Sequence, residues 1–136
     1  MFRQWRRRCC SAPAALEKPE AALAQIAAAL GVVGADDRRL RARLYALSGQ
    51  IFLAHGDLAN AIEHYERASV YDPTDGDVLF NLAAAIEAQG GRPARAHQLL
   101  ERALKELDPA QARGRRKQWA LLVSELTATV PSSKSR

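Results

Sequence analysis

The chain has 136 residues and a formal net charge of +5, and 48% of its residues are hydrophobic, with alanine much commoner than the β-branched residues. This length allows one domain, and the longest apolar run, residues 21–33, is too short to cross a bilayer. The only cysteines, Cys9 and Cys10, are adjacent, which excludes a disulfide framework and fits a reducing compartment or an organelle matrix.

The positive charge lies at the two ends of the chain. Residues 1–16 carry four arginines and no acidic residue, residues 17–108 carry ten basic and fourteen acidic residues, and residues 109–136 carry six basic and one acidic. A nucleic-acid-binding protein usually concentrates positive charge on the folded face that contacts phosphate. The distribution therefore argues against nucleic-acid binding.

Residues 1–15 form a basic N-terminal segment that also contains the bulky Phe2 and Trp5. An Arg-rich, acid-poor composition is typical of an organelle-targeting presequence, and residues 8–11 resemble the cleavage pattern of mitochondrial presequences. A plain basic tail explains the same composition. The sequence therefore leaves a mitochondrial and a cytoplasmic location open.

Between residues 16 and 128, apolar residues recur every three or four positions, which predicts amphipathic helices, and the many alanines favour helix over strand. Aspartate, proline and glycine mark the predicted ends. The predicted helices are, in chain order, 19–33, 36–56, 57–71, 75–90 and 93–107, with a last helix after Asp108-Pro109. Residues 129–136 are polar and are predicted to be a disordered tail.

A repeat becomes visible when the two Asp-Pro pairs, at residues 72–73 and 108–109, are laid over each other. Ala61, Tyr65 and Ala68 then match Ala96, Leu100 and Ala103, each 35 residues later. Self-similarity at this spacing predicts stacked helical hairpins.

The repeated pattern resembles the tetratricopeptide repeat family. In residues 42–75, the matching positions are Tyr45, Gly49, Phe52, Ala61, Tyr65, Ala68 and Pro73. In residues 76–109, they are Leu79, Leu82, Ala83, Ile86, Ala96, Leu100 and Ala103. Ser48 departs from the pattern, which usually has Leu there. The resemblance implies an all-α solenoid of antiparallel helix hairpins over residues 16–128, closed by a C-terminal capping helix near Trp119.

The resemblance also implies a protein–protein interaction module, an adaptor or scaffold that binds a partner peptide or helix in a concave groove. The residues expected to line this groove are Arg43, Ala46, Gln50, Leu53, Asp77, Phe80, Asn81, Ala84 and Glu87. We expect Phe80 to be an exposed aromatic anchor that points away from the core. In members that grip a terminal carboxylate, an Asn at the position of Asn81 belongs to a clamp. The clamp's other residues would fall at Ala46 and Gln50, so the clamp is incomplete.

A second candidate surface is the basic patch at the start of the last helix, which consists of Arg113, Arg115, Arg116 and Lys117. Positive charge opposes the dipole at a helix N-terminus, so helix stability does not account for the patch. It fits a contact with an acidic partner or a peripheral contact with a membrane surface, or a solvated first turn that keeps the protein soluble.

No pattern in the sequence indicates a catalytic site, a cofactor or a metal. Asp72, Asp75 and Asp77 resemble a calcium loop, but Pro73 and the missing downstream Glu argue against one. His64 is expected to be a solvated surface residue. The alternative to an adaptor is a small structural or assembly subunit of a larger complex, which would be mitochondrial if residues 1–15 direct import. The sequence leaves the oligomeric state open.

Overall fold

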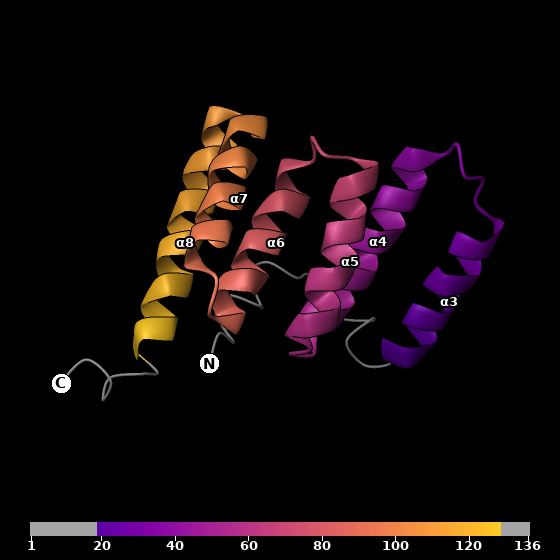
Figure 1. Cartoon of the computed structure of the whole chain (residues 1–136), viewed down its shortest axis with the longest axis horizontal. Coiled ribbons are helices and arrows are strands. Elements are labelled where there is room, and N and C mark those ends of the chain that lie inside the picture. Colours follow the sequence, from indigo (N-terminus) through magenta and orange to yellow (C-terminus); the bar gives the residue numbers. More distant parts are fainter. Residues whose placement is uncertain (1–18, 129–136) are drawn as a thin grey trace.

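The structure, a computed structural model, describes residues 19–128, which form six α-helices and no strand. The helices are α3 (Pro19–Val32), α4 (Arg38–Ala54), α5 (Leu58–Tyr71), α6 (Gly76–Gln89), α7 (Pro93–Glu106) and α8 (Pro109–Ala128). They follow one another in a row from α3 to α8 (Figure 1). The helices α4 and α5 pack together as one hairpin and α6 and α7 as a second, so the predicted all-α solenoid is confirmed. The predicted segments 1–15 and 129–136 lie outside the described residues.

Aspartate side chains fix the start of most helices, because they accept hydrogen bonds from backbone N–H groups that have no partner in the first turn. The predicted caps of α4, α5 and α6 are confirmed at Asp37, Asp57 and Asp75. Asp108, which was expected to end the fifth helix, also starts α8, because its Oδ1 accepts the N–H of Gln111 at 2.9 Å. Pro109 follows as the first helical residue, where proline needs no N–H donor.

The α4–α5 hairpin depends on a close approach at Gly49. A Cβ atom at this position would lie 2.9 Å from Cε1 of Tyr65, whose side chain is fully buried. Only a residue without a side chain therefore lets the Tyr65 ring lie against α4. Small residues at the α4–α5 and α6–α7 contacts, Ala61 and Ala96 among them, are also fully buried.

Helix α6 is the centre of the core, since every residue from Val78 to Ile86 is buried. A helix that is buried around its whole circumference needs neighbours on every side. Helices α5, α7 and α8 all contact α6. The last helix therefore packs on α6 as well as on α7.

Two arginines at the start of α4 hold the ends of neighbouring helices. Arg38 donates to the carbonyl oxygen of Val70 at 2.9 Å, near the end of α5, and Arg41 donates to that of Val33 at 2.9 Å, just after α3. Cations are favourable near helix C-termini, where carbonyl groups lack intrahelical partners. These contacts offset the unfavourable position of positive charge at the start of α4.

The close approach at Gly49 generates a test of the hairpin. Gly49→Ala should lower the free energy of unfolding by about 1–3 kcal/mol, because the methyl group meets the buried Tyr65 ring. Gly31→Ala is the matched control, since no atom lies within 4 Å of a Cβ there. Gly31→Ala should raise the free energy of unfolding by up to about 1 kcal/mol through helix propensity. Urea denaturation of both variants decides this, and equal effects would contradict the close approach.

Candidate protein-binding site

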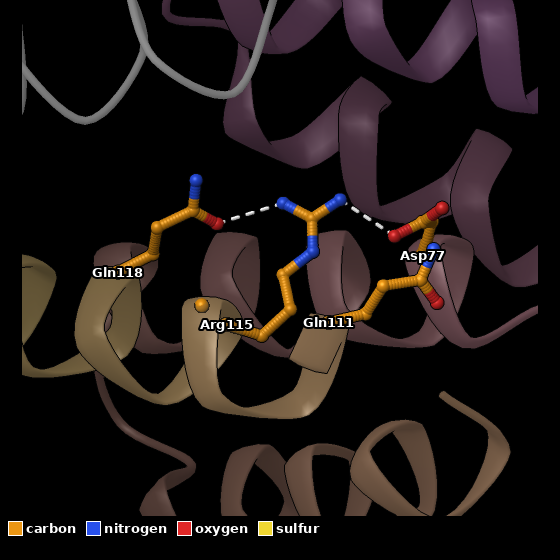
Figure 2. A pocket seen from close by; sticks show the side chains of 5 residues that line it. Asp77, Gln111, Arg115 and Gln118 are labelled. Carbon is orange, nitrogen blue, oxygen red and sulfur yellow. Dashed lines mark hydrogen bonds and ion pairs between the residues drawn. The ribbon is translucent and has the colours of Figure 1, made fainter. Parts of the chain in front are cut away.

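Arg115 on α8 lies between α6 and α8 and joins the two helices. Its Nη2 donates to Oδ1 of Asp77 at 2.5 Å, and its Nη1 donates to Oε1 of Gln118 at 2.7 Å (Figure 2). The guanidinium carbon also lies 5.0 Å from the centre of the Phe80 ring. Next to these contacts is an open pocket of about 250 Å³. It is lined by Asp77, Gln111, Gly114, Arg115 and Gln118. A partly exposed ion pair of this kind contributes at most about 1 kcal/mol, so Arg115 positions α8 more than it stabilises the fold.

Phe80 is fully buried, so the expectation of an exposed aromatic anchor is wrong. Its ring meets Trp119 edge-on, with ring centres 6.2 Å apart and planes inclined at 69°. The reason is that α8 packs across α6 and covers this position. Ala84 and Asn81 are buried too, as is Leu53 on α4, and these expected groove residues offer no side-chain surface in this structure.

A different stripe is accessible on α4. It consists of Leu40, Arg43, Leu47 and Gln50, which are spaced by three, four and three residues and therefore lie on one helix face. Leu40 and Leu47 are each 40% exposed, which is high for large apolar side chains, and Arg43 is exposed while Gln50 is half-buried. We refer to these four residues as the α4 stripe. It includes two of the expected groove residues and two that the sequence analysis did not single out.

Three buried acceptor oxygens on α6 and α8 have no hydrogen-bond partner: Oδ1 of Asn81, Oε1 of Glu87 and Oε2 of Glu125. Glu87 shares a face of α6 with Asp77, Phe80 and Ala84, and Glu125 lies two turns beyond Gln118 on α8. A buried acceptor without a donor costs about 1–3 kcal/mol, and more when it is charged. Helices α6 and α8 therefore each carry at least one buried acceptor that no described donor satisfies.

The predicted basic patch is divided by the structure. Arg115 turns toward α6 and is partly buried, whereas Arg113, Arg116 and Lys117 are exposed. Gln111 and Gln118 join Arg115 at the pocket although the sequence analysis did not name them. They lie 34 residues after Asp77 and Ala84, so extending the repeat period into α8 would have found them.

His64 was expected to be solvated, and the structure corrects this. The imidazole is half-buried, with ring centres 5.0 Å from Phe52 and 5.9 Å from Tyr45. Desolvation lowers the pKa of His64 from its ordinary value of 6.5, while Glu63 raises it and Arg67 lowers it further. The neutral ring is therefore the form that packs between the two aromatic side chains.

No helix within residues 19–128 is long and apolar enough to cross a membrane. Over the same stretch, no group of three His, Cys, Asp or Glu side chains is placed to hold a metal ion.

Comparison with known families identifies one repeat. A family model described as TPR repeat matches residues 49–90, from the middle of α4 through α5 to the end of α6. No match was found among curated proteins or among solved structures. The matched segment lies within residues 42–109, where the pattern of small and large residues indicated the repeat, so that assignment is confirmed.

The burial of Phe80 generates a prediction about stability. Phe80→Ala should lower the free energy of unfolding by about 3–5 kcal/mol, because it leaves a cavity between α6 and α8. Val70→Ala is a suitable control, since Val70 is 67% exposed, and it should change the free energy by less than about 0.5 kcal/mol. Chemical denaturation followed by circular dichroism measures both. A small effect at Phe80 would mean that α8 does not cover α6 in solution.

The His64 environment generates a pH prediction. The unfolded chain binds a proton at His64 more readily than the folded chain, so stability should be greatest above pH 6.5 and should fall as the pH drops through 6.5. His64→Phe removes this titration and should flatten the dependence in that range. Urea denaturation of both proteins across the pH range tests this. Parallel curves for the two proteins would contradict it.

Proposed function

Because the chain belongs to the tetratricopeptide repeat family, we propose that it is an adaptor that binds a peptide or helix of a partner protein. Repeats of this family generally mediate protein–protein interactions and are non-catalytic. The observation that carries the proposal is the α4 stripe, where two exposed leucines alternate with Arg43 and Gln50.

The chemistry of the α4 stripe supports a partner segment of a particular kind. Leu40 and Leu47 are suited to bury apolar anchors spaced by two helical turns, and Arg43 and Gln50 orient the ligand through hydrogen bonds. Most of the affinity is expected from the leucines, because solvated charges at the rim contribute little. A segment with two apolar side chains on one face and an acidic residue near Arg43 fits this surface.

The test compares two leucines of equal exposure. Leu47→Glu should abolish capture of the partner by the tagged full-length protein, and Leu121→Glu on α8 should not, although both side chains are 40% exposed. Mass spectrometry of the captured proteins gives the result, with circular dichroism to show that both variants fold. Retention of the same partners by Leu47→Glu would contradict binding through the α4 stripe.

The alternative function is a small structural or assembly subunit of a larger complex. The exposed apolar side chains favour it, since Val32 is 86% exposed at the end of α3 while Leu40 and Val70 are also exposed. Apolar surface spread over several helices suits a permanently buried contact. This alternative would be favoured if the protein co-purified with several subunits in a fixed ratio and if neither Leu47→Glu nor Leu121→Glu disrupted that co-purification.

A further inference from the structure

We propose that Arg39 and Arg43 form a charged edge of the α4 stripe, and that this edge selects a partner segment with two acidic side chains one helical turn apart. The proposal rests on the proposed function, since the partner is the one that the α4 stripe binds. Arg39 lies four residues before Arg43 and therefore on the same helix face. Leu40 and Leu47 follow the other edge of that face.

The charge of α4 is entirely positive. The helix carries four arginines, all within residues 38–43, and no acidic residue. Positive side chains near a helix N-terminus oppose the dipole, and like charges four residues apart repel each other, so both features lower helix stability. For Arg38 and Arg41, this effect is offset by their contacts with the carbonyl oxygens of Val70 and Val33.

Arg39 and Arg43 have no such contact. Both are exposed, and neither has a hydrogen bond or an ion pair with the described part of the chain. Two acidic residues of the adjoining loops are engaged elsewhere, because Asp37 caps α4 and Asp72 accepts hydrogen bonds from the backbone N–H and the hydroxyl of Thr74. The two guanidinium groups therefore keep all their donors for a ligand.

An open pocket of about 400 Å³ lies at the arginine end of the α4 stripe. It is lined by Arg38, Arg39, Tyr71, Asp72 and Thr74. Arg38 is held in place here, since it donates to the carbonyl oxygen of Val70 and its guanidinium carbon lies 5.3 Å from the centre of the Tyr71 ring. A guanidinium has five N–H donors, so Arg38 retains donors for a carboxylate. The pocket therefore offers an acidic side chain a site that is already ordered before binding.

The combined surface fits an acidic amphipathic segment better than a nucleic acid. A carboxylate gains a charge-assisted hydrogen bond from a guanidinium, and apolar side chains beside it would cover Leu40 and Leu47, each 40% exposed. A phosphate backbone would satisfy the arginines but leave the leucines in water. Charge complementarity sets specificity and the rate of association more than affinity. The arginines are therefore expected to choose the partner and the leucines to hold it.

Two synthetic peptides test this selection. Each is a helix as long as α4, amidated at its C-terminus, with two leucines two turns apart. The charged residues beside the leucines, one turn apart, are glutamates in one peptide and lysines in the other. In fluorescence anisotropy at moderate salt, the full-length protein should bind the glutamate peptide at least about tenfold more tightly, because like charges brought together oppose binding. Equal affinities, or a preference for lysine, would overturn the proposal.

Charge reversal on the protein tests whether these residues set the preference. Arg39→Glu combined with Arg43→Glu should make the protein prefer the lysine peptide. Glutamate is favourable near a helix N-terminus, so α4 should still form, which circular dichroism checks. Arg113→Glu combined with Arg116→Glu makes the same charge change at exposed positions on α8 and should keep the preference for glutamate. A preference that survives in the α4 variant, or that is lost in the α8 variant, would overturn the proposal.

Competing anions test the class of ligand. Phosphatidylserine vesicles and a DNA duplex should each fail to displace the bound glutamate peptide at moderate salt. Displacement by the vesicles would assign the arginines to a membrane surface, displacement by the duplex would assign them to a nucleic acid, and either would overturn the proposal.

Leu47→Ala separates this proposal from the proposed function. It should weaken binding of both peptides and leave the preference for glutamate unchanged. If the two peptides bound equally and Leu47→Ala still weakened both, the acid selection would be wrong while the α4 stripe stood. If Leu47→Ala changed neither affinity, the α4 stripe itself would be wrong, and the acid selection with it.

Discussion

The contact between Phe80 and Trp119 ties the last helix to the centre of the molecule. Both aromatic side chains are buried, and Arg115 covers the Phe80 ring from the same helix that carries Trp119. Aromatic pairs bury a large apolar area and prefer this edge-on geometry. Because α8 provides this cover, α6 is buried around its whole circumference, and a side chain such as Phe80 is not exposed to water.

This packing decides which surfaces are left for other molecules. In a stack of helical hairpins each unit buries its apolar face against the next, and the last unit needs a helix that closes the stack. Here the closing helix also covers the α6 positions that would otherwise line a concave groove. On α4, by contrast, Leu40 and Leu47 stay accessible, because no described helix lies over them to bury them fully.

The same cover leaves polar atoms in an apolar environment. Asn81 and Glu87 on α6 have buried oxygens without donors, and Glu125 on α8 has another. Electrostatic interactions are stronger where water is excluded, so a cation that reached these oxygens would gain more than it would at the surface.

The sequence by itself determined the helices and the repeat. Asp37, Asp57 and Asp75 cap helices because a carboxylate accepts the unpaired N–H groups of the first turn, which is a local effect. Gly49 and Tyr65 indicated a tight hairpin because their sizes are complementary at repeat spacing. Only the tertiary structure decided that Phe80 is buried in the core, that the Arg115 side chain points toward α6, and that His64 packs between the rings of Tyr45 and Phe52. Those outcomes depend on the angle at which α8 crosses α6 and on the fit of α4 against α5. Side chains far apart in the sequence set these two arrangements together, and no spacing within one helix encodes them.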